Sequence, residues 1–261
     1  MRILRAFIAI MLVMSLTVDV HAVDRRRKIV TGCQEMRGLN KISSLVLWYE
    51  GDSVAIDGVG GVTEFRDLSR SKNNAIQTNA SFRPLMIPAI GGPGPDFTDL
   101  VYFDGTDDYL TFSPILNLGT SFTVAWTSDF VDFTFQRPIL GNSGGAFNSI
   151  NHLTSTTTGI IYNNGLSFTF THGNIGDGFA HHFIMTSDGD LYVDGAAASR
   201  AGIQGTGLSF DRIGATGAVT YFMGVLDDVS VFNQPLTKSD KNFVGNFLEN
   251  RNGGAAWTDI P

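Results

Sequence analysis

Five Asp-Gly dipeptides divide this chain, beginning at Asp57, Asp104, Asp177, Asp188 and Asp194. Asp and Gly suit tight turns, because Gly tolerates a positive φ angle and the Asp side chain bonds to nearby backbone groups. An Asp-Gly pair between alternating apolar segments is a strong local signal for a β-hairpin. We therefore expect a chain built mainly from antiparallel strands joined by hairpins.

The residues between the turns have the matching periodicity. Apolar Phe122, Val124 and Trp126 alternate with small or polar neighbours, and so do Phe168 and Phe170. This alternation is typical of antiparallel sheets with one buried face. Strands are predicted at 44–49, 62–68, 101–104, 108–112, 121–127, 130–135, 158–162, 167–172, 180–187, 190–194 and 221–233. A Pro- and Gly-rich stretch over 84–97 predicts an irregular crossover.

One helix is expected near the end of the chain. Thr237 and Asp240 form a capping-box pattern, with Asp in place of the usual Glu or Gln. The apolar residues that follow fall on one helical face, and Asn252-Gly253 is a stop signal; they are Phe243, Val244, Phe247 and Leu248. We expect the helix to close one end of a β-sandwich.

Several segments resemble one known family in the right order. They are Asp188–Gly195 (DGDLYVDG), Gly224–Asn233 (GVLDDVSVFN) and Pro235–Asp240 (PLTKSD), preceded by Val101–Leu110 (VYFDGTDDYL) and the Leu45–Pro84 lead-in (LWY, F-x-DLS, NNA, RP). Together they resemble the laminin-G-like, concanavalin-A-like lectin-glucanase jelly-roll family. The resemblance covers roughly residues 44–250. It implies an all-β antiparallel jelly-roll sandwich with one short C-terminal helix, occupying residues 44–261.

The N-terminus is expected to be an export signal. Arg2 and Arg5 precede an apolar stretch over 6–18, and Val20-His21-Ala22 fits a cleavage site, so residues 1–22 are predicted to be a signal peptide. Residues 23–43 read as a basic linker. This favours a secreted or cell-surface protein without a membrane span. The basic run 25–28 argues against export, and Met36 is an alternative start that would favour a virion protein.

Composition excludes some functions. The net charge is −7, so the chain lacks the basic balance expected of a nucleic-acid binder. Cys33 is the single cysteine, which excludes an intrachain disulfide within this sequence. Asp outnumbers Glu 21 to 4, and such oxygen ligands suit hard cations such as Ca²⁺.

Catalytic patterns fail on their context. Gly141–Gly145 matches G-x-S-x-G, but no helical pattern follows, so a Gly-rich hairpin is expected. His181 and His182 are adjacent on a strand and should face opposite sides, one toward the sheet or core and one toward solvent. The four Glu residues include no strand pair for retaining glycoside hydrolysis, which needs two carboxyls about 5 Å apart. We therefore expect no enzyme activity.

The acidic candidates come from the resemblance. In the family, acidic residues at the first turn and in the late strand contribute to calcium sites or to structural hydrogen bonds. The resemblance thus implies Asp104, Asp107 and Asp227 as metal ligands, with Asp108 and Asp228 behind them. The alternative is that the turn acids only stabilise the turn.

The expected function is non-catalytic recognition of a carbohydrate or other surface ligand in an extracellular or adhesion setting. Tyr162, Tyr221 and Trp257 are candidate sugar contacts. The alternative is a phage virion protein, a capsid decoration or tail component that contacts capsid or tail proteins and forms a homo-oligomer. A glycoside-active enzyme comes third.

Overall fold

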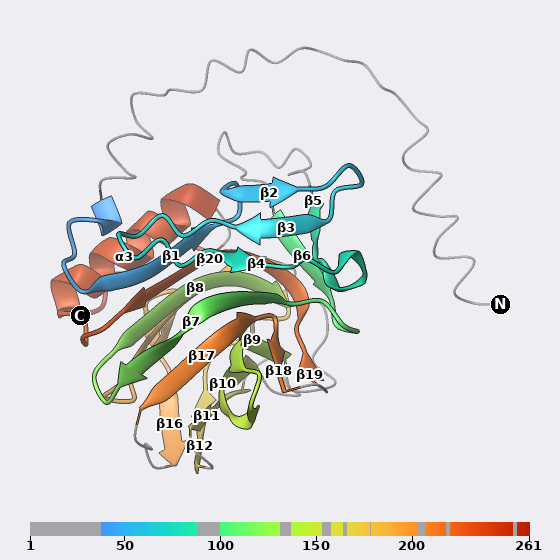
Figure 1. Ribbon diagram of the computed structural model, residues 1–261. Coiled ribbons are helices and arrows are strands. Elements are labelled where there is room, and N and C mark those ends of the chain that lie inside the picture. Colours follow the sequence, from blue (N-terminus) through green and yellow to red (C-terminus); the bar gives the residue numbers. More distant parts are fainter. Residues whose placement is uncertain are drawn as a thin grey trace, which may run out of the picture. The chain divides into compact units, whose positions relative to one another are not determined.

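Within the described residues, all strands but one short pair form two antiparallel sheets that face each other across a shared core (Figure 1). The computed structural model describes residues 38–87, 100–130, 137–152, 158–163, 166–177, 179–202, 207–217, 220–252 and 255–261. The predicted signal peptide, Cys33, Met36, most of the linker, most of the 84–97 crossover and most of the 130–135 strand lie outside these residues. The all-β antiparallel sandwich with a C-terminal helix is confirmed.

The first sheet has the order β15-β14-β13-β8-β20-β6-β5, with β1 also paired to β20. The early residues of β20 pair with β6 and its later residues with β1, so both neighbours share one edge of this long strand. The strands are β1 Leu45–Glu50, β5 Leu85–Ile87, β6 Leu100–Asp104, β8 Thr123–Phe130, β13 His181–Thr186, β14 Leu191–Val193, β15 Ala196–Ala197 and β20 Met223–Phe232.

The second sheet has the order β16-β12-β11-β10-β9-β17-β7-β4-β3-β2. Its strands are β2 Val54–Ile56, β3 Val62–Phe65, β4 Ala75–Ile76, β7 Leu110–Gly119, β9 Arg137–Asn142, β10 Gly145–His152, β11 Thr158–Asn163, β12 Leu166–Thr171, β16 Ser199–Gly202 and β17 Leu208–Ile213. The short strands β18 Ala215–Thr216 and β19 Thr220–Tyr221 pair with each other in a separate two-stranded sheet. A 3₁₀ turn covers Ala80–Phe82.

The core between the sheets combines aliphatic residues with several packed aromatic rings. Trp126 and Phe183, from neighbouring strands β8 and β13, stack at 4.8 Å between ring centroids, and both are buried. Phe103 and Phe222 meet edge to face. Burying each such side chain stabilises the fold by roughly 1.5–3 kcal/mol. The alternating apolar residues of the sequence therefore supply the main energy that holds the two sheets together.

The Asp-Gly turns at the end of the chain behave as the sequence predicts. Asp188-Gly189 joins β13 to β14, and Gly189 has φ 87°. Asp194-Gly195 joins β14 to β15 with both residues at positive φ, 50° and 82°. The Gly141–Gly145 segment is a hairpin between β9 and β10, so its serine does not sit on a strand-to-helix elbow.

The helix α3 spans Lys238–Asn252. The Thr237 hydroxyl accepts the Asp240 N–H at 3.2 Å, as the capping-box pattern predicts. The same hydroxyl also donates to the Asp240 carboxylate at 2.7 Å. The buried face of α3 packs with Trp48 and Phe232 on the outer face of the first sheet, so the expectation that it closes one end is wrong. Phe243 was expected on this face but is 44 % exposed.

Several polar residues of the Leu45–Pro84 lead-in belong to a turn built around Asp67. This buried carboxylate accepts N–H bonds from Trp48, Ser69 and Asn73 at 2.8–2.9 Å, and the Ser69 hydroxyl at 2.9 Å. Three backbone donors and one hydroxyl thus satisfy a charge that would otherwise be costly to bury. The polar residues of the DLS and NN segments therefore stabilise this turn through hydrogen bonds.

Candidate functional site

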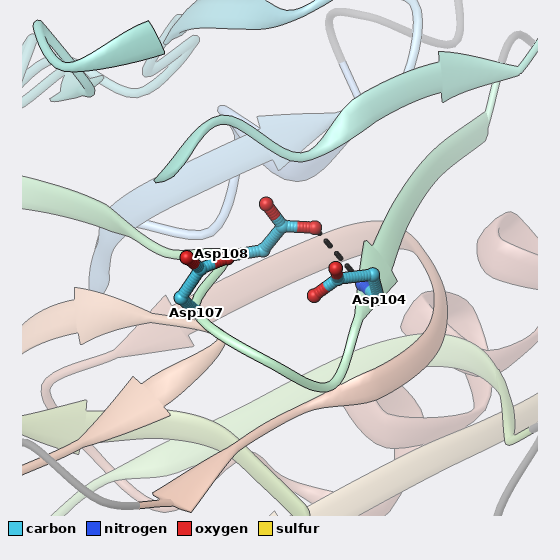
Figure 2. A group of neighbouring side chains, drawn as sticks. All are labelled: Asp104, Asp107 and Asp108. Atoms are coloured by element: carbon cyan, nitrogen blue, oxygen red, sulfur yellow. Dashed lines mark hydrogen bonds between the residues drawn. The ribbon is translucent and has the colours of Figure 1, made fainter. Parts of the chain in front are cut away.

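The turn between β6 and β7 carries the chain from one sheet to the other and brings three carboxylates together. The ligand oxygens of Asp104, Asp107 and Asp108 all lie within 4.8 Å of one another (Figure 2). The Asp108 carboxylate accepts the Asp104 N–H at 2.9 Å, and the Asp104 carboxylate accepts the Thr106 N–H at 2.7 Å. Part of the set inferred from the resemblance is therefore assembled here.

The three acids differ in their surroundings. Asp104 is exposed, Asp107 is half-buried and Asp108 is buried. Burial raises the pKa of Asp108 to about 7, and the neighbouring charges of Asp104 and Asp107 add to the rise, against the lowering effect of the Asp104 N–H. A carboxyl group in this position is stabilised when a bound proton or cation offsets the local negative charge. Carboxylate oxygens are the ligands that Ca²⁺ takes, so the donor set fits that ion.

An aromatic and cationic stack begins at the next residue of the chain. The Tyr109 ring stacks with Phe82 at 5.6 Å between centroids, and the Arg212 guanidinium lies 4.6 Å from the Tyr109 centroid. The Tyr109 N–H donates to the Phe82 carbonyl at 3.1 Å, which ties the 3₁₀ turn to the start of β7. All three side chains are half-buried. Sequence reasoning missed this stack because its members come from three separate segments.

Asp227 and Asp228 lie elsewhere. Met223 of β20 pairs with Asp104, and Asp227 stands four residues further along the strand. The register between β20 and β8 shifts between Leu226 and Val229, and both of these residues point into the main core. Strict alternation along a strand would place Leu226 and Val229 on opposite faces, so β20 departs from alternation between these two residues. Asp227 does not join the three turn acids.

Asp228 belongs to a buried polar network beneath the end of α3. Its carboxylate accepts the Asn252 amide at 2.6 Å and lies 3.5 Å from the Arg251 Nε. Glu50, paired with Asp228 across β1 and β20, lies 3.4 Å from the Arg251 Nη1. The Asn252 amide also donates to Thr127 at 3.0 Å. The network fastens the helix to the outer face of the first sheet.

The two histidines are both buried, at 4 % and 0 % exposure, so the expectation of one solvent-facing ring is wrong. His182 lies 3.0 Å from the Thr127 hydroxyl through its Nδ1. The His181 Nδ1 lies 2.7 Å from Asp194 and its Nε2 lies 3.0 Å from Asp177. Segments from outside the strand, including those that carry Asp177 and Asp194, pack against His181. The alternation of residues along one strand cannot predict burial by such distant segments.

Of the aromatic sugar-contact candidates, Tyr221 is half-buried and the Tyr162 side chain lies outside the described residues. Trp257 is 6 % exposed and packs in the cluster under α3, with Gly245 beneath its ring. It is therefore a packing residue. Among the described helices, none combines the length and apolar character needed to cross a bilayer.

No protein-family model matches this chain, and no curated protein matches it. Solved structures do share its fold. Trypanosoma rangeli sialidase is similar with a TM-score of 0.54 and 16 % identity, over 85 % of this chain and 38 % of that one. The same sialidase in complex with sialic acid gives a TM-score of 0.51 and 17 % identity, over 85 % and 38 %. This chain thus spans well under half the length of these sialidase chains.

A weaker similarity, with a TM-score of 0.47 and 13 % identity, is to Domain 4 of AbnA, a GH43 extracellular arabinanase from Geobacillus stearothermophilus, in complex with arabinotriose. It covers 78 % of this chain and 98 % of that one. The two sialidase comparisons, with TM-scores above 0.5 but identities of 16 % and 17 %, show a shared fold and nothing about activity. Membership of the laminin-G-like family stays a prediction.

Proposed function

We propose that this protein is a non-catalytic carbohydrate-recognition module whose binding site is the β6–β7 corner. The observation that carries the proposal is the meeting of two chemistries at one turn. Three carboxylates converge over 104–108, and the stack of Phe82, Tyr109 and Arg212 begins at the following residue. Aromatic faces bind the apolar faces of sugar rings, and acids or their bound cation bind sugar hydroxyls.

Ca²⁺ is the proposed partner of the three acids. Asp104, Asp107 and Asp108 would hold it through their carboxylate oxygens, and the positive ion would offset the burial and the neighbouring charges that raise the pKa of Asp108 to about 7. Its remaining coordination positions, which Ca²⁺ fills with up to eight oxygens, would be open to water or to ligand hydroxyls. Calcium binding and sugar binding should therefore be coupled.

The test is a glycan array, followed by calorimetry on any glycan that binds, with Ca²⁺ and with EDTA. Asp107→Asn should abolish Ca²⁺ binding and weaken glycan binding at least tenfold, the loss expected when a cation site loses one of three charges. Asp188→Asn is the matched control, because it changes an Asp in the turn between β13 and β14. The calcium site would be refuted if both variants lost Ca²⁺ and glycan binding equally, or if glycan binding persisted in EDTA.

The stack needs its own variant. Tyr109→Ala should weaken sugar binding but leave Ca²⁺ affinity unchanged, because the ring provides contact area and no metal oxygen. Tyr192→Ala is the control, because Tyr192 is a half-buried tyrosine on β14 that also has a cation, Lys241, over its ring. Unchanged glycan affinity in Tyr109→Ala would place the sugar elsewhere on the protein.

Glycoside hydrolysis is the second candidate, and one observation favours it. The turn brings carboxylates within 4.8 Å, close to the spacing that retaining enzymes use, and one of them has its pKa raised to about 7. These acids lie in a turn, where the alternation of side chains along a strand does not predict a carboxyl pair. Release of reducing sugar that disappears in Asp108→Asn would establish hydrolysis and displace the recognition proposal.

Export and the virion alternative remain predictions of the sequence. N-terminal sequencing of the natively produced protein tests cleavage after Ala22. A start at Met1 or Met36, together with copurification in virus particles, would favour a capsid or tail protein.

A further inference from the structure

His181 is held between two carboxylates that come from different parts of the chain. Asp194, in the turn between β14 and β15, lies 2.7 Å from the Nδ1 of the ring. Asp177, in the connection between β12 and β13, lies 3.0 Å from the Nε2. The ring itself is 4 % exposed, while the two carboxylate side chains are 20 % and 40 % exposed respectively.

This arrangement requires a particular protonation state. A carboxylate only accepts hydrogen bonds, and a neutral imidazole has one N–H to donate. Both contacts can be hydrogen bonds only when His181 carries a proton on each nitrogen, as an imidazolium. A neutral ring would turn a lone pair toward one carboxylate, and that contact would become repulsive.

The structure also indicates which contact fails first. The Asp194 carboxylate accepts the His182 N–H at 2.9 Å, and its carbonyl accepts the Thr258 N–H at 2.9 Å, so this turn is fixed from two sides. Asp177 is more exposed, and its described backbone partner is the nearby Phe179 N–H at 3.0 Å. A neutral His181 would keep its bond to Asp194 and release Asp177.

We propose that His181 and its two carboxylates form a proton-dependent clamp, which fastens the β12–β13 connection to the β14–β15 turn and releases the connection as the pH rises. The proposal concerns a device separate from the carbohydrate site and stands without it. The β12–β13 connection would be fastened in mildly acidic solution and released in mildly alkaline solution. Histidine side chains titrate in this pH range.

Besides Asp177 and Asp194, two further titratable groups interact with His181, the acid Asp129 and the second ring His172. Burial alone would lower the pKa of His181, but its bonds to Asp194 and Asp177 outweigh burial and raise the pKa above the ordinary value. Asp129 of β8 interacts electrostatically with His181, and burial raises the pKa of Asp129. Burial lowers the pKa of His172, at the end of β12, so this second ring is neutral first.

Two measurements on the whole protein test the clamp. Ring ¹H–¹⁵N spectra from pH 5.5 to 9 report whether His181 is doubly protonated. Amide exchange around Asp177 and Phe179, corrected for intrinsic chemistry, reports release. We expect an imidazolium at pH 5.5, and exchange that is roughly tenfold faster at pH 9, as the loss of one charged hydrogen bond implies.

Asp177→Asn is the decisive variant. An Asn amide can donate to a neutral Nε2, so the connection should stay fastened at both pH values and the pH dependence of exchange should vanish. In Asp177→Ala, the amides of this connection should exchange fast at both pH values. A His181 with one ring proton at pH 5.5, or titration of the ring without any change in exchange near Asp177, would overturn the proposal. Asp188→Asn should behave as wild type.

Discussion

Replacing Glu50 by Gln should make the protein more stable in alkaline solution, although it removes an ion-pair partner. Glu50 is 2 % exposed and faces Asp228 across β1 and β20. Burial raises the pKa of Glu50 to about 9, and the charge of Asp228 adds to the rise, against the lowering effect of Arg251. One guanidinium serves two buried carboxyls, so one carboxyl keeps its proton.

The sign of the effect follows from proton uptake. Between the ordinary pKa of 4.5 and the folded value of about 9, the folded chain holds a proton that the unfolded chain has released. Stability therefore falls as the pH rises through this window, by up to about 1.4 kcal/mol per pH unit for one proton. From pH 5 to pH 8 the loss reaches roughly 4 kcal/mol, which is a large part of a typical domain's stability.

Gln cannot ionise and has nearly the same shape as protonated Glu. Urea unfolding at pH 5 should give similar free energies for both proteins, and at pH 8 Glu50→Gln should be the more stable by up to the loss worked out above. Glu64→Gln, on β3 in the other sheet, is the matched control and should follow the wild-type slope. Parallel stability curves for wild type and Glu50→Gln would refute the assignment of a buried neutral acid.

Three further outcomes are expected. Asp67→Ala should cost roughly 3 kcal/mol or more in urea unfolding, because several buried N–H groups lose their acceptor together. Gly245→Ala should lower stability by about 1–3 kcal/mol, because its Cβ would lie 2.1 Å from the Trp257 ring, whereas Gly58→Ala meets open space and should be neutral. Added Ca²⁺ should raise Tm more at pH 8 than at pH 5.5, because at the lower pH a proton competes for Asp108, whose pKa burial raises to about 7.

The sequence predicts those parts of the fold that short-range chemistry decides. The hairpin at Asp188-Gly189 and the helix start at Thr237 follow from residues within four positions of each other. The strand predictions near 101–104, 158–162 and 190–194 agree with β6, β11 and β14, because alternation marks a half-buried strand. Local turn and capping signals were sufficient there.

The remaining features depend on distant segments. Strict alternation along β20 fails at Asp227 and Asp228, because the register shift against β8 inserts an irregularity that no local signal announces. The burial of both histidines depends on the segments that cover the sheet. The Tyr109 stack needs Arg212, about a hundred residues away along the chain, and β17, the strand that carries Arg212, was not predicted. Long-range contacts decide these features.

The Asp residues of the chain differ in how many hydrogen-bond donors and cationic side chains contact their carboxylates. This difference distinguishes the acids that stabilise the fold from those of the candidate site. The Asp67 carboxylate accepts three backbone N–H groups and a hydroxyl, and Asp57 accepts two backbone N–H groups and an ion pair from Arg83 at 2.8 Å. Their charges are balanced inside the fold. Asp104, Asp107 and Asp108 instead face one another, and within the described residues the bonds we identify supply two backbone N–H groups for three carboxylates. Negative charge in excess of its donors favours a cation, and for this reason the β6–β7 corner, among all the Asp-rich turns, is where calcium and a ligand are proposed to bind.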